Sequence, residues 1–125
     1  SSSVNDQYVP YIVPQEHGNK TGLRWIMLKK ENTLGIFISS PFLFEGSVSH
    51  YPDEDLYSAS HAYKLEPRSH TSVYLDHCQR GLGTGSCGPD TLEKYLIPSG
   101  LHQFNFVLRP FDPKKTKYEK FFRSL

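Results

Sequence analysis

The sequence predicts a β-rich domain of antiparallel strands, and three observations support this prediction. Tyrosine, phenylalanine, valine and isoleucine recur along the chain, and these residues favour strands. Nine glycines and nine prolines divide the 125 residues into short segments. Several segments alternate apolar and polar side chains, as a half-buried strand does. A hydrophobic content of 37% is enough for a core, and the length fits one domain over residues 1–125.

The strand pattern recurs along most of the chain. The first three strands would form a meander, with a hairpin at residues 30–33 and a break at residues 39–41. The expected strands span residues 22–29, 34–38, 42–49, 72–75, 93–97 and 102–109. The side chains expected to face the core are Phe42, Phe44 and Val48 on the third strand and Phe104, Phe106 and Leu108 on the last.

A short helix is expected near residues 52–61. Pro52 suits the first helical position, and Asp53, Glu54 and Asp55 follow it where the helix dipole favours negative charge. His61 would lie in the last turn. The three carboxylates are adjacent and would fan out, which predicts a solvated helix start in preference to a metal or catalytic site.

The two ends of the chain have distinct patterns. Residues 1–7 form a polar N-terminal arm, and the prolines that follow predict an extended segment or an edge strand over residues 8–14. The tail, residues 111–125, is expected to carry an amphipathic helix that begins near Asp112 and docks on the domain. Its apolar face would comprise Tyr118, Phe121, Phe122 and Leu125.

The composition excludes several function classes. A net charge of +1 provides no field for phosphates, so no nucleic acid partner is expected. No window reaches the ~20 apolar residues of a membrane span, so a soluble, cytoplasmic or periplasmic protein with no membrane partner is expected. Motifs of serine hydrolases, phosphate-binding loops and zinc proteases do not occur.

Residues 76–89, Asp-His-Cys-Gln-Arg-Gly-Leu-Gly-Thr-Gly-Ser-Cys-Gly-Pro, predict a functional loop. So many glycines directly behind a strand are incompatible with regular structure, and a simple connection would be shorter. Cys87 lies near its tip. Three roles stay open for it: a small semi-buried residue, a nucleophile activated by a nearby base, or a residue that lines a pocket of another element.

Metal binding and a disulfide are not expected. His77 and Cys78 are adjacent and would point to opposite faces of a strand, and the spacing from Cys78 to Cys87 is not that of a structural zinc site. Free thiols are the commoner state unless the compartment is oxidising. Glu16 and His17 are interpreted as residues of a polar turn.

Several motifs in one order resemble the C-terminal domain of the large bacterial β-galactosidases of glycoside hydrolase family 2. The resemblance runs from about Tyr8 to Pro110. The motifs are Val9-Pro10-Tyr11-Ile12-Val13-Pro14-Gln15-Glu16-His17-Gly18-Asn19, Arg24-Trp25, Tyr51-Pro52 with Leu56, Leu75-Asp76, Gln79-Arg80-Gly81-Leu82-Gly83, Ser86-Cys87-Gly88-Pro89 and Phe104-Asn105-Phe106.

The resemblance implies one part of a retaining, multidomain β-galactosidase that hydrolyses terminal β-D-galactosyl residues such as that of lactose. This chain would be an antiparallel β-sandwich within a galactose-mutarotase-like supersandwich. The partner domain would be a catalytic barrel with two glutamates, and the parent enzyme would use magnesium and a monovalent cation. This chain would hold no catalytic residue and no cofactor. The fragment would then be inactive alone, and its unpaired strand edges would favour self-association.

The resemblance also implies substrate-binding residues. The loop would reach the mouth of the barrel, where Gly85, Ser86 and Cys87 would line the aglycone side of the galactoside. Many family members carry a tryptophan at the position of Cys87. A cysteine cannot provide the same aromatic platform, so selection for glucose at this position is expected to be weaker.

Two alternatives from other classes stay open. A carbohydrate-binding module would hold sugar by itself, with exposed aromatic residues such as Tyr57, Tyr63 or Tyr74 as stacking platforms. A mutarotase-like sugar epimerase would need a histidine and a carboxylate that converge on a pocket.

Overall fold

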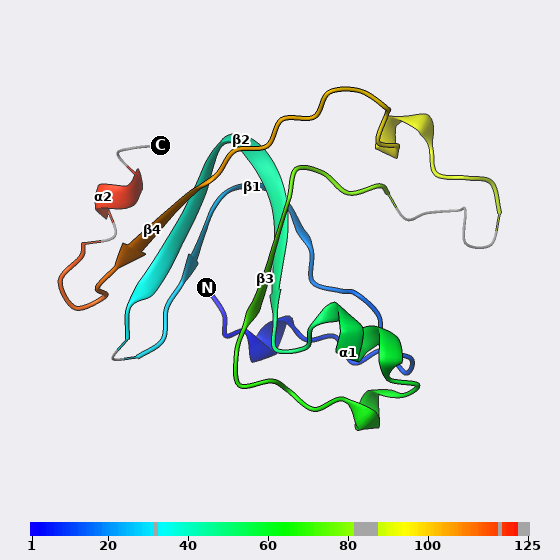
Figure 1. Cartoon of the computed structure of the whole chain (residues 1–125), viewed down its shortest axis with the longest axis horizontal. Helices are drawn as coiled ribbons and strands as arrows, with labels where there is room; N and C mark the ends of the chain where they lie inside the picture. The colour runs from blue at the N-terminus through cyan, green and yellow to red at the C-terminus, as the bar shows by residue number, and fades with distance from the viewer. Residues whose placement is uncertain (32, 82–87, 118, 123–125) are drawn as a thin grey trace. The chain divides into compact units, whose positions relative to one another are not determined.

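The computed structural model describes residues 1–31, 33–81, 88–117 and 119–122 (Figure 1). Within this part of the chain, the strands are β1 (Lys20–Leu28), β2 (Gly35–Ser49), β3 (Ser72–Asp76) and β4 (Val107–Phe111). The α-helices are α1 (Asp53–Ser58) and α2 (Glu119–Phe122), and 3-10 turns occupy Asn5–Gln7, Ala62–Lys64 and Glu93–Tyr95. The predicted all-β, antiparallel class is confirmed, and the sheet is consistent with a β-sandwich.

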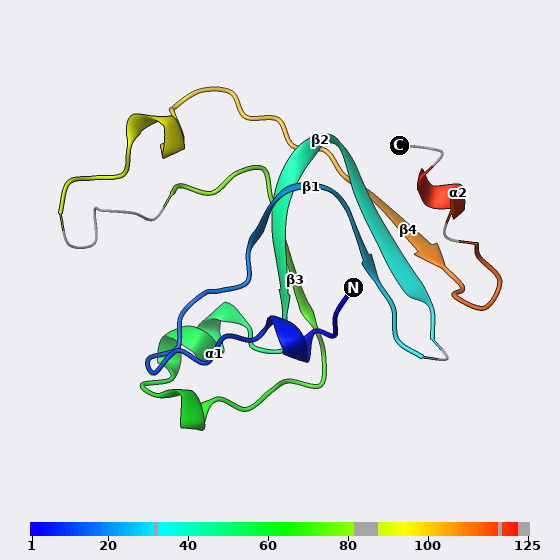
Figure 2. The ribbon, with the colours of Figure 1, turned by 180° about the vertical axis from the view of Figure 1, so that it is seen from behind.

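Strand β2 organises the sheet. It lies between β1 and β3 and also pairs with β4 (Figure 2). The first part of β2 pairs with β4, from Gly35 opposite Phe111 to Ser39 opposite Val107. Its last part pairs with β3, from Glu45 opposite Asp76 to Ser49 opposite Ser72.

The described chain forms two compact units. The first comprises Ser1–Thr21 and Glu45–Asp76, and the second comprises Gly22–Phe44 and His77–Leu125. No helix in the described residues has the length and apolar character needed to cross a membrane.

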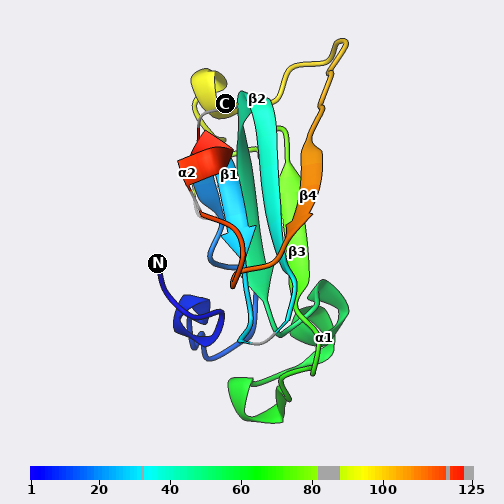
Figure 3. The same cartoon turned by 90° about the vertical axis from the view of Figure 1, so that its left-hand side faces the viewer.

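The core of the second unit is aromatic. Phe37, Phe111 and Phe121 are 0%, 5% and 8% exposed, and the rings of Phe37 and Phe121 stack at 4.6 Å, which places α2 beside β2 (Figure 3). A Cβ atom on Gly35 would lie 2.6 Å from Phe111 Cε1 and 2.9 Å from the Leu28 carbonyl oxygen. Glycine at position 35 therefore lets Phe111 pack against the paired strands.

Within the described residues, the helix of the tail begins later than the sequence predicts. Asp112 caps a separate turn, because its carboxylate accepts the Lys114 backbone N–H at 2.9 Å and its carbonyl accepts the Thr116 N–H at 2.9 Å. Helix α2 begins only at Glu119. Phe121 provides the contact with the core, while Tyr118, Leu125 and the Phe122 side chain lie outside the description.

The predicted break at residues 39–41 is wrong, because β2 continues through Pro41 as one strand of 15 residues. The β4 register ends at Ser39 and the β3 register begins at Glu45, so Pro41 lies in the interval between these two ladders. A proline, which has no N–H to donate, is tolerated at such a position. Phe44 is buried as predicted, whereas Phe42 is 57% exposed.

The last two predicted strands also differ from the structure. Residues 93–95 form a 3-10 turn, and β4 begins at Val107 instead of residue 102. Phe106 and Leu108 are 46% and 51% exposed, while Phe111 carries the burial expected of them. Apolar alternation identified strand-like segments here but not which of them find a partner in the sheet. Residues 8–14 do not form an edge strand either.

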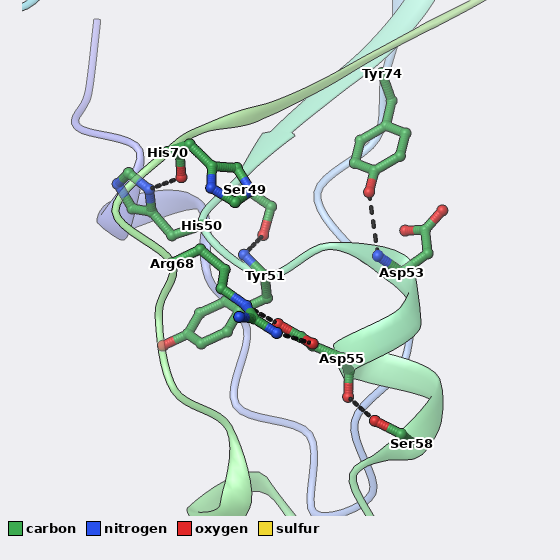
Figure 4. A network of polar contacts seen from close by, with 9 residues as sticks. All are labelled: Ser49, His50, Tyr51, Asp53, Asp55, Ser58, Arg68, His70 and Tyr74. Atoms are coloured by element: carbon green, nitrogen blue, oxygen red, sulfur yellow. Dashed lines mark hydrogen bonds and ion pairs between the residues drawn. The ribbon is translucent and has the colours of Figure 1, made fainter.

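Helix α1, in the first unit, is held by polar contacts on its exposed side (Figure 4). Asp55 accepts hydrogen bonds from Arg68 Nε at 2.7 Å and Nη2 at 2.8 Å. The Asp53 backbone N–H donates to the Tyr74 hydroxyl oxygen at 3.2 Å, which joins the helix start to β3. Leu56, 5% exposed, supplies the apolar contact.

The acidic first turn of α1 is confirmed, but the helix is shorter than residues 52–61. Pro52 is the N-cap with ψ 160°, and Ala59 is already extended with ψ 117°. Ser58 Oγ donates to the Asp55 carbonyl oxygen at 3.3 Å, a local bond that competes with helix propagation. His61 consequently lies beyond the helix.

The Asp55–Arg68 pair predicts a pH dependence of stability. The hydrogen bonds from Arg68 lower the pKa of Asp55 below its ordinary value of 3.8. Because the folded-state pKa is depressed, the contribution is present above the unfolded pKa and is lost as the pH falls through the folded pKa. Arg68→Met should raise the Asp55 pKa toward 3.8 and flatten the acid limb of the stability curve.

Carboxyl NMR titration of Asp55, combined with thermal unfolding between about pH 2 and 7, measures both effects. Arg80→Met is the matched control, because Arg80 pairs with Asp90 and should change the pKa of that carboxylate alone. An Asp55 titration that Arg68→Met leaves unchanged would contradict this account.

Candidate functional site

The described residues on either side of the predicted loop are bonded to each other in the second unit. Thr91 Oγ1 donates to the Gly81 carbonyl oxygen at 2.7 Å, and the Gly81 N–H donates to the Tyr95 carbonyl oxygen at 2.9 Å. The Arg80 guanidinium pairs with the Asp90 carboxylate. The described residues that flank positions 82–87 are therefore joined to each other by hydrogen bonds and an ion pair, and we call this group of contacts the loop base.

The local sequence explains why this base closes. Thr91 is only 7% exposed and Gly81 is half-buried, so the hydrogen bond between them is partly shielded from water. A Cβ atom on Gly81 would lie 2.8 Å from Tyr95 Cβ and 3.1 Å from Thr91 Cγ2, closer than a larger residue allows. The 3-10 turn Glu93–Tyr95 is closed by a hydrogen bond from the Tyr95 N–H to the Leu92 carbonyl at 2.8 Å. The carbonyl of Tyr95, at the end of this turn, accepts the Gly81 N–H.

Charge adds to the closure. The hydrogen bond from Arg80, and next that from the Thr91 backbone N–H, lower the pKa of Asp90 below 3.8. Asp90 therefore stays ionised and able to pair with Arg80 at neutral pH. The side chains of Arg80 and Asp90 are each at least half-exposed, so solvent weakens their ion pair. The hydrogen bond from Thr91 to Gly81 is better shielded than this ion pair.

Sequence reasoning singled out residues 76–89 but missed the residues that bond across the described flanks of this stretch. The predicted substrate-binding residues Gly85, Ser86 and Cys87 lie outside the described residues, and their role stays a prediction. Thr91 and Asp90 were not singled out. The available signal was the pair of opposite charges at positions 80 and 90, which bracket the glycine-rich segment.

A second group of chemically active side chains meets close to the end of β3. One ligand atom from each of His77, Cys78 and His102 lies within 4.8 Å of the others. Among the residues that the structure describes, this is the only group of three or more His, Cys, Asp or Glu side chains that lie this close together. The expectation that His77 and Cys78 point to opposite faces of a strand does not hold, because β3 ends at Asp76.

Cys78 is half-buried and is a free thiol. Cys87, the other cysteine of the chain, lies outside the described residues.

The remaining candidates have local roles. His17 Nδ1 contacts the Gln15 carbonyl oxygen at 2.9 Å, as a turn residue does. Tyr57 and Tyr63 are 95% and 80% exposed, while the Tyr74 hydroxyl oxygen accepts the Asp53 N–H. The pKa of the Tyr74 hydroxyl is raised, chiefly because the group is partly buried.

Comparison with known proteins places the chain in a family. The family described as beta galactosidase small chain matches residues 1–108. The β-galactosidase of Staphylococcus xylosus is 29% identical over 108 residues, which cover 86% of this chain and 11% of that protein. The β-galactosidase of Priestia megaterium is 33% identical over 110 residues, which cover 86% of this chain and 11% of that protein. The β-galactosidase of Actinobacillus pleuropneumoniae is 28% identical over 107 residues, which cover 86% of this chain and 10% of that protein. The chain thus spans about a tenth of the length of these curated relatives.

The loop base predicts the effect of one isosteric substitution. Thr91→Val removes the hydroxyl that donates to the Gly81 carbonyl and leaves a part-buried acceptor without this partner. We expect a loss of about 1–3 kcal/mol in the free energy of unfolding. Hydrogen exchange of the Gly81 amide should also accelerate, because its bond to Tyr95 depends on the same closure.

Urea denaturation and mass-spectrometric hydrogen exchange provide the two measurements. Thr71→Val, at an exposed position before β3, is the matched control and should change stability by less than about 0.5 kcal/mol. Equal effects of the two substitutions would show that Thr91 does not close the loop.

Proposed function

Because the chain belongs to the β-galactosidase small-chain family, we propose that it is a non-catalytic C-terminal segment of such an enzyme. The enzyme would hydrolyse terminal β-D-galactosyl residues, as in lactose, with retention of configuration. Retaining hydrolysis needs two carboxyl groups about 5–5.5 Å apart on either side of the scissile bond. In this proposal a catalytic barrel outside the chain supplies both carboxyl groups, the parent enzyme uses magnesium and a monovalent cation, and the isolated chain is inactive.

The observation that carries the proposal is the closed base of the glycine loop. A loop that contributes to a site on another domain must start from fixed ends, since disorder at its base would spread to its tip. The Thr91–Gly81 and Gly81–Tyr95 hydrogen bonds fix those ends. The glycines between them allow close approach to a neighbouring surface.

Within this proposal, Gly85, Ser86 and Cys87 line the aglycone side of the bound galactoside. Cys87 is a small, weakly polar residue and contributes less contact area than an aromatic ring. The site should therefore accept different leaving groups with little discrimination.

Exposed apolar side chains support a role within a larger assembly. Phe42 and Leu43 on β2 are each 57% exposed, and Val107 and Leu108 on β4 are 45% and 51% exposed. Adjacent apolar residues on strands are normally covered by a partner surface. We propose that other parts of the β-galactosidase cover them, and that isolated copies of the chain self-associate through them.

Substitution of Cys87 tests the proposed site in the gene product that contains this chain. Cys87→Trp should lower KM for lactose roughly two- to tenfold, because a ring stacked on the glucose adds about 0.5–1.5 kcal/mol. A galactoside with a small methyl aglycone should be unaffected, since it offers nothing to stack on. Tyr57→Trp, at an exposed position on α1, is the control.

Equal KM values of the Cys87→Trp and unsubstituted enzymes for lactose would place the loop away from the substrate. Hydrolysis of a nitrophenyl galactoside by the isolated chain would overturn the non-catalytic role itself.

A carbohydrate-binding module is the second candidate, favoured by the exposure of Tyr57 and Tyr63. Calorimetric titration of galactose or lactose into the isolated chain separates the two functions. Saturable binding that Tyr57→Ala or Tyr63→Ala abolishes supports the module. An isolated chain that binds neither galactose nor lactose fits the primary proposal.

A further inference from the structure

The strongest unassigned feature is the group formed by His77, Cys78 and His102. All three residues belong to the second unit, and one ligand atom from each lies within 4.8 Å of the others. Two imidazoles and one thiolate form a borderline-soft donor set, which suits zinc better than magnesium or calcium. We propose that these three residues bind a Zn²⁺ ion, with water in the fourth position.

The backbone explains how adjacent residues can bind one ion. In a strand, His77 and Cys78 would point to opposite faces. The strand ends at Asp76, and residue 77 lies in a bend, so the alternation no longer applies. His102 approaches from the segment that precedes β4, so the ion would connect two stretches of chain.

Each histidine is oriented by a contact of its own. His102 Nε2 lies 2.9 Å from the Pro98 carbonyl oxygen, and a carbonyl can only accept, so Nε2 carries the proton and Nδ1 carries the free lone pair. A ligating histidine commonly donates its second N–H in this way. The His77 ring meets the His102 ring edge-on at 5.6 Å and the Phe104 ring at 6.2 Å.

The spacing is close to that of a zinc site. With Zn–N near 2.0–2.1 Å and Zn–S near 2.3 Å, tetrahedral ligand atoms lie about 3.3–3.7 Å apart. The present separations, up to 4.8 Å, need a contraction of about 1 Å, which side-chain rotations provide. The histidines are exposed and Cys78 is half-buried, so an ion can enter from solvent while the thiolate is partly shielded.

The position suggests a structural role. The proposed ion joins the start of the segment between β3 and β4 to its later part, and the glycine loop lies between the two attachment points. Within the described residues, Thr91 is the one side chain in the 88–106 stretch that is buried, so a metal would add a constraint where apolar burial is small. This proposed zinc site is independent of the proposed β-galactosidase role, and the two proposals are tested separately.

Metal titration of the whole chain under reducing conditions tests the proposal. We expect one Zn²⁺ per chain with Kd on the order of 1 µM or tighter, a Tm that rises with added zinc, and no comparable effect of Mg²⁺. Co²⁺, as a spectroscopic substitute, should give a near-ultraviolet thiolate charge-transfer band and the intense visible bands of tetrahedral coordination.

Variants assign the ligands. Cys78→Ser should abolish the Co²⁺ thiolate band, and His102→Ala should weaken Zn²⁺ binding at least tenfold, since loss of even an outer partner of a ligand costs about 10- to 100-fold. His61→Ala, an exposed histidine of the first unit, is the matched control and should bind Zn²⁺ normally. Far-ultraviolet circular dichroism verifies that each variant folds.

Three results would overturn the proposal: binding only at millimolar Zn²⁺, a thiolate band that survives Cys78→Ser, or equal losses in His102→Ala and His61→Ala. β-Galactosidase activity enters none of these measurements, so its absence leaves the zinc site unaffected.

Discussion

Strand β2 is the constraint on which the rest of the structure depends. Its first residues pair with β4 and its last residues pair with β3, so both ends of the segment between those strands are bonded to it. Gly35, the first residue of β2, lets Phe111 pack against the strand. The Glu45–Asp76 pair is the last of the ladder between β2 and β3 and lies directly before His77. A long excursion such as residues 77–106 can then carry a functional loop without a core of its own, because its start and end are both held in the sheet.

Closure of the glycine loop is local and polar. Thr91 and Gly81 bond across the loop base, and the turn at Glu93–Tyr95 supplies the second acceptor. These contacts hold together the described residues that flank the six-residue stretch 82–87, as the proposed contribution of this stretch to another domain requires.

The elements that the sequence predicted well are those that a local rule decides. Alternation identified the strands around Trp25 and Tyr74, and the acidic first turn identified α1. Local rules failed where a tertiary partner decided the outcome. Pro41 does not interrupt β2, because it lies between the ladders that β2 forms with β4 and with β3. Tyr95 lies in a 3-10 turn instead of a strand, and its carbonyl accepts the Gly81 N–H.

The two candidate sites show the same division. Composition singles out the glycine-rich stretch 76–89, whose functional role stays a prediction. It does not single out Thr91, because the importance of Thr91 comes from its burial and from a partner ten residues away. The cluster of His77, Cys78 and His102 was excluded by strand alternation, which stops applying one residue before His77. Sequence patterns indicate where regular structure lies, but they do not show which irregular segments meet.

The central claim is that the loop tip lies against the substrate of a larger enzyme, and alkylation of Cys87 in the gene product tests it most directly. The account predicts that a maleimide reagent modifies Cys87, that bound galactoside slows this modification, and that the modified enzyme loses activity on lactose. The Cys78 thiol, in the same chain, is the internal reference, since substrate should not protect it. Modification of Cys87 at the same rate with and without substrate, with activity retained, would contradict the account.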